Sequence, residues 1–401
     1  LKMTQQEIIM NLTEKYLPHI INLRRTIHKH PELSNEEQDT AALLAGELKA
    51  LGFDVRENIA GGYGVSALLK GNHPGPTVAL RTDMDALAVQ EDTGLSFASE
   101  TEGKMHACGH DAHMAILIGT ASVLADMKPA IRGNILFICQ PAEENAPTGG
   151  AKAIVAAGLL DGVAAVYGLH VWPALPTGTV GVRTGPVMAA SDHVVIIIKG
   201  KSAHAAMPHK GIDALVAAAQ FITAVQDSIS RQIDPLCPAV LTFGKIYGGT
   251  RYNIIADEVV LEGTCRTYNK ETQDTIEKHI ADILSGLDLM YGTTSTLVYE
   301  RGYAAVVNTP QEASLAAQAV IGQLGQAALV EPPEPAMTAE DFSGYLQKYA
   351  GAFLWLGATA PGDTVYPLHS DKFAADENCL SVGIQCMTAL ILASLSMHNQ
   401  N

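Results

Sequence analysis

Hydrophobic and polar positions along the chain first predict two helices and then a series of buried strands. The helices are expected at residues 5–28 and 35–51, and apolar strand-like runs follow at 64–69, 77–80 and 134–139. The last run is almost entirely apolar, which is typical of a strand buried on both faces by helices. This part of the chain therefore predicts an α/β fold with a helix-covered mixed sheet.

A different pattern begins near residue 187. Strands and helices are expected there in the order β-α-β-β-α-β, which is typical of a ferredoxin-like domain. In chain order they are a strand at 192–198, a helix at 211–231, strands at 239–243 and 258–263, a helix at 270–287 and a strand at 296–299. The α/β pattern returns near residue 309. We therefore expect a large domain of residues 1–186 and 303–401 with residues 187–302 inserted as a small domain.

Composition narrows the classes of partner. Of 401 residues, 47% are hydrophobic and 17% charged, which is enough apolar material for a large core. Lys and Arg number 26 against 42 Asp and Glu, so the net charge is −16. Such a surface repels phosphate backbones and anionic lipid, so neither nucleic acid nor a membrane is expected as a partner.

No targeting or membrane-spanning segment is expected. The opening residues carry no apolar run typical of a signal peptide. The strongest apolar stretch, near residues 389–395, is far shorter than the roughly 20 residues that span a bilayer. The six scattered cysteines form no CxxC pair, which indicates free thiols in a reducing cytoplasm.

Metal-capable side chains are densest at residues 105–113, which include His106, Cys108, His110 and His113. Thiolate and imidazole together suit a borderline metal such as Zn²⁺. In an extended backbone the side chains at 106, 108 and 110 would point the same way, so spacing alone does not separate them. The alternative is a loop with buried structural histidines.

Further candidates follow the predicted strands. Glu143 and Glu144 come just after the apolar run at 134–139, where α/β sheets place ligands. Because adjacent side chains diverge, one could ligate a metal while the other moves protons. A solvated acidic turn is the alternative. Asp85 follows another strand, and His170 and His369 are isolated histidines that could equally be structural. Together these residues predict a metal centre.

The ordered motifs make the chain resemble the amidohydrolase branch of the co-catalytic metallopeptidases. This branch includes hippurate hydrolases, bacterial N-acyl-L-amino-acid amidohydrolases (aminoacylases) and plant auxin-conjugate hydrolases. The resemblance covers essentially the whole chain. Its carriers are residues 25–33, 81–87, 105–113, 140–144, 168–170, 202–209, 340–342 and 368–370.

The resemblance implies a role for each matching residue. It implies that Glu143 is the general base and that His204, from the inserted lid domain, reaches the reaction centre. Asp85 matches an active-site aspartate, and Asn253 and Arg266 match lid positions that hold a substrate carboxylate. The implied metal ligands are Cys108, His110, Glu144, His170 and His369.

The implied activity is metal-dependent hydrolysis of the amide bond of small N-acyl amino acids. It yields a carboxylic acid and a free amino acid, with two divalent ions per subunit, Zn²⁺ or Mn²⁺, with Co²⁺ or Ni²⁺ as further options. A homodimer or higher homo-oligomer through the lid domain is also expected. A dipeptidase or carboxypeptidase on the same scaffold is one alternative. A catalytically silent metal-binding homologue is the other.

Overall fold

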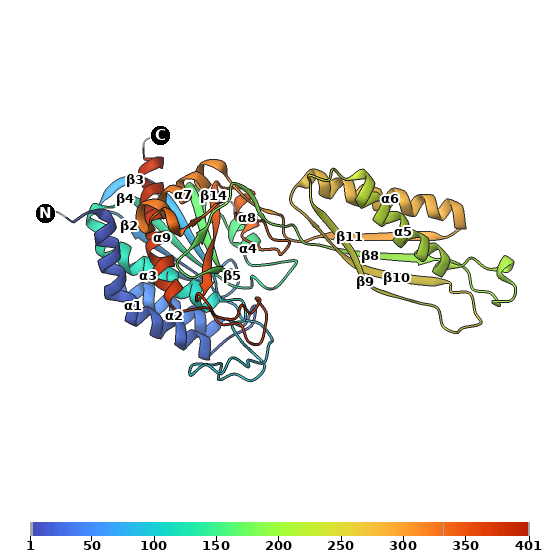
Figure 1. Ribbon diagram of the computed structural model, residues 1–401, viewed down its shortest axis with the longest axis horizontal. Helices are drawn as coiled ribbons and strands as arrows, with labels where there is room; N and C mark the ends of the chain where they lie inside the picture. The colour runs from blue at the N-terminus through green and yellow to red at the C-terminus, as the bar shows by residue number, and fades with distance from the viewer. Residues whose placement is uncertain (1–2, 332, 400–401) are drawn as a thin grey trace. The chain divides into compact units, whose positions relative to one another are not determined.

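The computed structural model describes residues 3–331 and 333–399, which form two compact units (Figure 1). The first unit runs to Val187 and continues with Val307–Glu334 and with the chain from Asp341 onward. The second unit comprises Met188–Val306 and a short later segment, Pro335–Glu340. The sequence pattern did not indicate this later segment, which follows a proline cluster. Pro332 of that cluster lies outside the described residues.

The first unit is built on a mixed eight-stranded sheet with the strand order β1-β2-β4-β3-β5-β14-β6-β13. Its strands are β1 (Asp54–Ile59), β2 (Gly64–Lys70), β3 (His73–Asp83), β4 (Arg132–Gln140), β5 (Val163–Pro176), β6 (Val180–Gly181), β13 (Leu329–Val330) and β14 (Gly351–Thr359). The central strands β4, β3, β5 and β14 run parallel to one another, so their carboxyl ends lie along one edge. The sequence-based prediction of a mixed α/β sheet is confirmed.

Helices bury both faces of most of this sheet. They are α1 (Gln5–Lys29), α2 (Gln38–Ala50), α3 (His110–Met127), α4 (Ala151–Ala156), α7 (Pro310–Leu324), α8 (Ser343–Leu346) and α9 (Asn378–His398), with 3₁₀ turns at Lys128–Ala130 and Gln326–Ala328. The first fifteen residues of α3 are all buried, because α1, α9 and the sheet surround it (Figure 1). This burial explains why α3 is apolar around most of its circumference.

The expectation that no apolar stretch is long enough to span a bilayer was wrong for α9. This helix of 21 residues is long and apolar enough to cross a membrane by length and composition. The apolar stretch at 389–395 is only its last part. Within the described chain, however, 67% of its most apolar window is buried against the rest of the protein. Its hydropathy is therefore that of a core helix packed between α3, α7 and β14.

The second unit has the predicted order β-α-β-β-α-β. Its elements are β8 (Asp192–Lys199), a 3₁₀ turn at Pro208–Lys210, α5 (Ala214–Gln232), β9 (Ala239–Gly248), β10 (Glu258–Thr267), α6 (Lys270–Tyr291) and β11 (Thr294–Arg301). The four strands form an antiparallel sheet in the order β11-β8-β10-β9. Ile196, Phe221, Leu261 and Ile280 belong to its own buried core, which strands and helices build together. The chain enters and leaves this unit along β7 (Gly185–Met188) and β12 (Val306–Asn308), which pair with each other.

Candidate metal centre and the loops that hold it

The loop before α3 turns sharply between Cys108 and His110. Gly109 has φ of 86° and forms the N-cap of the helix, and His110 is the first helical residue. A Cβ atom at Gly109 would lie 2.3 Å from Cγ2 of Val171, so only glycine fits this turn. The extended backbone considered from the sequence is therefore not present here. His106 lies on the other side of the turn, buried, and its ring nitrogens have no hydrogen-bond partner among the described residues.

His110 and His113 lie one turn apart on α3 but have different surroundings. The Nδ1 of His110 donates to the main-chain oxygen of Asp85 at 2.8 Å, and its buried Nε2 has no hydrogen-bond partner within the described chain. The His113 ring is fully used, because Nδ1 lies 2.7 Å from Asp83 Oδ1 and Nε2 accepts from the Val171 N–H at 2.9 Å. His110 therefore offers a free nitrogen and His113 does not.

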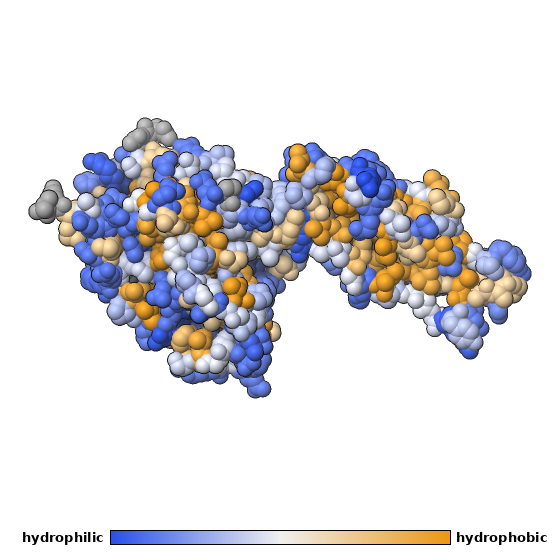
Figure 2. All heavy atoms as spheres, in the orientation of Figure 1, coloured by the Kyte–Doolittle hydropathy of each residue, from blue (hydrophilic) through white to orange (hydrophobic). Residues whose placement is uncertain are grey.

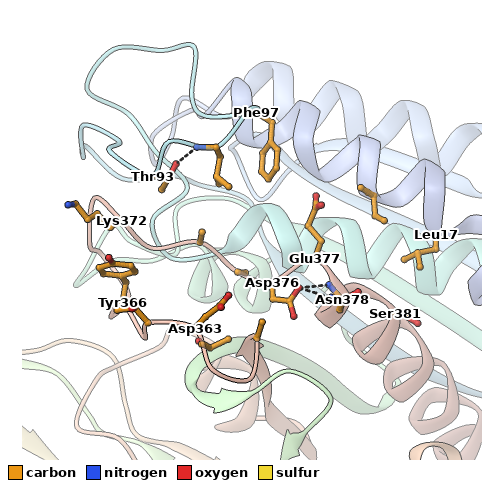
Figure 3. A pocket seen from close by; sticks show the side chains of 17 residues that line it. Leu17, Thr93, Phe97, Asp363, Tyr366, Lys372, Asp376, Glu377, Asn378 and Ser381 are labelled. Carbon is orange, nitrogen blue, oxygen red and sulfur yellow. Dashed lines mark hydrogen bonds between the residues drawn. The ribbon is translucent and has the colours of Figure 1, made fainter.

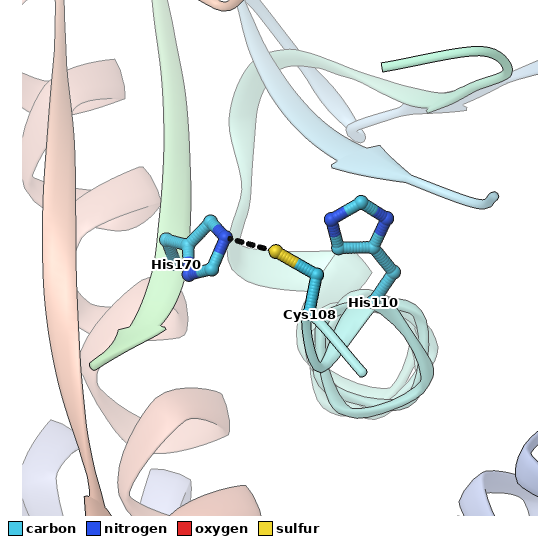
Figure 4. A group of neighbouring side chains, drawn as sticks. All are labelled: Cys108, His110 and His170. Carbon is cyan, nitrogen blue, oxygen red and sulfur yellow. Dashed lines mark hydrogen bonds between the residues drawn. The ribbon is translucent and has the colours of Figure 1, made fainter. Parts of the chain in front are cut away.

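Two groups of metal-capable side chains meet at Cys108. The ligand atoms of Cys108, His110 and His170 lie within 4.8 Å of one another, and so do those of Cys108, Glu144 and His369. Figure 4 shows the first group, with His170 Nε2 3.3 Å from Cys108 Sγ. In the second group, His369 Nε2 lies 3.2 Å from Glu144 Oε1. The structure thus brings all five implied ligands together. Cys108 and His110 lie at the start of α3, Glu144 follows β4, His170 lies within β5, and His369 lies in the loop before α9.

Asp85 supports the turn that carries Glu143 and Glu144. Its carboxylate accepts from the main-chain N–H of Glu143 at 3.1 Å and from that of Glu144 at 2.9 Å. It also accepts from the Ser34 hydroxyl at 2.6 Å. The Glu143 side chain points elsewhere, and its Oε1 accepts from the Asp341 N–H at 3.3 Å. The two adjacent glutamates therefore do have different partners.

The electrostatics of the cluster suit a bound cation. Burial opposes a positive charge on His110, but the Asp83 and Asp85 carboxylates outweigh it and raise its pKa to about 10. Burial, together with Glu144 and Glu143, raises the pKa of the Cys108 thiol well above its usual value. The cluster therefore favours positive charge at His110 and opposes a negative charge on the Cys108 thiol. A divalent cation bound there would neutralise the surrounding carboxylates and allow the thiol to ionise. The residues present therefore fit a metal centre.

The three residues predicted on the inserted domain do not gather at one place. The segments around His204 and Asn253 are neighbours, because the Ala205 N–H donates to the Asn253 main-chain oxygen and His204 bridges to Ile254. These two segments continue the pairing of β8 with β10 beyond its Lys199–Glu258 pair. Arg266 lies eight residues after Glu258 on β10, which corresponds to about 26 Å along the strand.

A separate surface pocket of about 640 Å³ lies beside the loop that carries His369 (Figure 3). Tyr366 and Lys372 line it, but none of the described lining residues belongs to the predicted ligand set. Two of its acidic side chains already have partners: Glu377 accepts from Arg25, and Asp376 accepts from Asn378. This pocket therefore has no evident part in the metal chemistry.

Sequence reasoning missed two supporting carboxylates. Asp83 accepts from His113 and Arg81, and Asp341 accepts from Arg81, from Gln140 and from two N–H groups at the start of α4. Both lie inside motifs that carry the resemblance, which was the available signal. Their partners are far away in the chain, so their tasks became visible only in the folded protein.

Comparison with known proteins identifies the family to which a chain with this geometry belongs. Residues 79–393 match the model of peptidase family M20/M25/M40. A thermostable carboxypeptidase of Saccharolobus solfataricus is 40% identical over 91% of this chain and 92% of its own length. An N-acyl-L-amino acid amidohydrolase of Geobacillus stearothermophilus is 41% identical over 76% of this chain and 82% of its own.

A solved structure agrees with both. The crystal structure of a dinuclear metal-binding peptidase of this family from Bacillus subtilis is similar, with a TM-score of 0.84 and 35% identity. The match covers 96% of this chain and 99% of that one. The family match and the relatives together establish both fold and class: the chain is a hydrolase that belongs to peptidase family M20/M25/M40.

Proposed function

We propose that this hydrolase is a metal-dependent amidohydrolase that releases a carboxylic acid and a free amino acid from small N-acyl amino acids. The observation that carries the proposal is the convergence of two ligand groups that share Cys108. Cys108, His110 and His170 would hold one divalent ion, and Cys108, Glu144 and His369 would hold the other. Thiolate and imidazole favour Zn²⁺, while carboxylate ligation also admits Mn²⁺, Co²⁺ or Ni²⁺.

The bound ions would supply Lewis acidity and lower the pKa of the attacking water. Glu143 is the proposed general base, which removes a proton from this water and later gives it to the departing amine. Its carboxylate is buried and is oriented by the Asp341 N–H. Asp85 holds the main chain of Glu143, and the Asp341 N–H holds its carboxylate, so different residues fix the backbone and the side chain of the proposed base.

The second unit would supply groups for the substrate. His204 is the proposed donor to the developing oxyanion, and Asn253 and Arg266 are the proposed partners of the substrate carboxylate. A homodimer through this unit is part of the proposal. Strand β9 is an edge strand of its sheet and pairs with β10 on one side. Its Val240, Ile246 and Tyr247 are exposed, in the unit where Figure 2 shows apolar side chains gathered on the visible face.

A carboxypeptidase or dipeptidase is the second candidate, because a carboxypeptidase is among the relatives that match along most of the chain. A substrate panel separates the two. We expect turnover of N-acetyl and N-benzoyl amino acids to exceed that of unblocked dipeptides by at least tenfold. The reverse ranking would favour the peptidase.

The same panel tests the metal. Chelation should abolish turnover, and Zn²⁺, Mn²⁺ or Co²⁺ should restore it. Full turnover after exhaustive metal removal, verified by elemental analysis, would contradict the metal-dependent mechanism. No turnover of any amide with any of these metals would instead indicate a silent homologue.

A further inference from the structure

The turn after β4 that carries the two glutamates has an unusual backbone. Ala142 has φ of 58°, in the left-handed region that non-glycine residues rarely adopt. This conformation is sterically disfavoured for an alanine, so its surroundings must hold it. Ala142 is buried and directly precedes Glu143, so its φ and ψ set the direction in which the proposed base leaves the strand.

A carboxylate far away in the sequence holds this residue. Glu37 Oε1 accepts the main-chain N–H of Ala142 at 2.7 Å, and Glu37 is fully buried. With Asp85 accepting the N–H groups of Glu143 and Glu144, buried carboxylates hold three consecutive amides of the turn. Of the two carboxylates, Glu37 is the one that accepts the hydrogen bond of the strained residue itself.

The local structure around Glu37 also points to this task. Glu37 is the N-cap residue of α2, a position whose side chain usually accepts from the first turn of its own helix, but it makes no such bond. Glu32 does so instead, and its carboxylate accepts the N–H groups of Asp39 and Thr40. Glu37 is thereby free to reach Ala142.

We propose that Glu37 is a positioning residue for catalysis, which holds Ala142 in its left-handed conformation and so aims Glu143 at the substrate. The inference rests on the proposed role of Glu143 as general base. It extends the site to the segment Glu32–Glu37, which the catalytic mechanism otherwise leaves unused. Ser34, in the same segment, supports the turn indirectly through Asp85.

The bond does not require a charge on Glu37. Burial, together with the nearby Asp85 carboxylate, raises the pKa of Glu37 to about 7. A protonated carboxyl still presents a carbonyl oxygen to the Ala142 N–H, and so does the amide of glutamine. A glutamine should therefore replace Glu37, whereas an alanine should not.

The test compares Glu37→Ala with Glu37→Gln, both assayed with N-acetyl amino acids at saturating metal. Misplacing a catalytic group by about 1 Å can cost roughly 10²-fold in rate. We expect Glu37→Ala to lower kcat 10- to 100-fold with KM changed less than threefold, and Glu37→Gln to stay within threefold of wild type. A kcat of Glu37→Ala near wild type would overturn the proposal. A loss confined to limiting metal would overturn it as well, because Glu37 would then act only on metal retention through Glu144.

A second variant tests whether the backbone of Ala142 is the link. Glycine adopts positive φ at no steric cost. The double variant Glu37→Ala/Ala142→Gly should therefore have a kcat at least threefold higher than that of Glu37→Ala. No recovery would show that Glu37 acts by another route.

Hydrogen exchange in the metal-free protein gives a measurement independent of activity. The amides of residues 142–144 should exchange at least tenfold faster in Glu37→Ala and remain protected in Glu37→Gln. Unchanged exchange in Glu37→Ala would contradict the proposal that Glu37 holds the turn, even if kcat fell. These results are distinct from a failure of the proposed function, because that failure would appear as undiminished turnover by Glu143→Gln.

Discussion

The residues expected to carry chemistry are held differently in the two units. In the first unit, their partners come from distant parts of the chain: Asp85 binds Ser34 and the turn at 143–144, and His110 binds Asp85. In the second unit, the partners are local. The His204 ring accepts from the Ala206 N–H, and Arg266 donates to Thr264 and to the Cys265 main-chain oxygen.

This contrast separates a prearranged site from an adaptable one. Side chains that are fixed by long-range hydrogen bonds keep their geometry before substrate binds. Such preorganised groups supply most of the electrostatic stabilisation of a transition state. Side chains with only local bonds can reorient at little cost. We therefore expect the first unit to set whether the reaction occurs, and the second to adjust how the substrate is held.

The largest expected effect tests the prearranged site. Glu143→Gln keeps the size of the side chain but removes the base, so kcat should fall by roughly 10²- to 10⁴-fold. Metal content, measured by elemental analysis, should remain that of wild type. Glu144→Gln is the matched control and should lose metal. If Glu143→Gln lost metal while Glu144→Gln kept it, the two roles would be exchanged.

The next effect concerns the ligand shared by both groups. Cys108→Ser should weaken metal binding by more than the roughly 10- to 100-fold that follows loss of a residue supporting a ligand. Cys139→Ser is the control. Burial raises the pKa of the Cys139 thiol to about 12 inside β4, so this residue stays a neutral core group. Competition with a chromogenic chelator gives both affinities, and equal losses would remove Cys108 from the ligand set.

Much of this arrangement could be predicted from the sequence, because it depends on local patterns. Apolar runs located the strands that end at the site, and the order of elements from 192 to 301 indicated the ferredoxin-like fold. The turn at Gly109 could not be predicted, because it depends on close approach to Val171. Neither could the bond from Glu37 to Ala142, which joins residues 105 positions apart. Long-range contacts leave no periodic signal, so they require the folded chain.

A smaller effect is expected in the adaptable unit. His204→Ala should lower kcat on the order of 10²-fold, the cost of losing one oxyanion donor, with metal content unchanged. A kcat near that of wild type would leave His204 as a surface histidine. This result would also sharpen the comparison, because the second unit would then contribute only the proposed partners of the substrate carboxylate, Asn253 and Arg266.

Subunit mixing tests whether the two ends of the second unit serve one substrate. His204 and Arg266 are separated by at least about 26 Å of strand, farther than a small N-acyl amino acid reaches. If both act, at least one must come from another copy of the chain. Glu143→Gln protein mixed with His204→Ala, or with Arg266→Ala, should therefore recover activity in at least one mixture. No recovery in either, with subunit exchange verified, would exclude a joint role.

The last prediction concerns stability and depends on the buried charges beside the site. His28 on α1 lies 2.9 Å from Asp111 and 3.3 Å from Glu91, and Arg24 binds the same Asp111 oxygen. Burial alone would lower the pKa of His28, but the two carboxylates outweigh it and raise the pKa to about 9. Since the unfolded value is 6.5, the charged ring stabilises the folded state fully below pH 6.5, and this stability is lost as pH rises through 9.

The charged His28 ring contributes up to about 3 kcal/mol to the free energy of unfolding, and this contribution can be assigned to the first unit. Both tryptophans, Trp172 and Trp355, lie stacked in that unit, so their fluorescence follows its unfolding alone. In metal-free protein unfolded by urea, wild type should exceed His28→Gln in stability at pH 6 by more than at pH 9.5. A difference independent of pH would mean that His28 contributes packing but no charge. The buried network would then organise the site by shape and hydrogen bonds, with charge concentrated at the metal ligands.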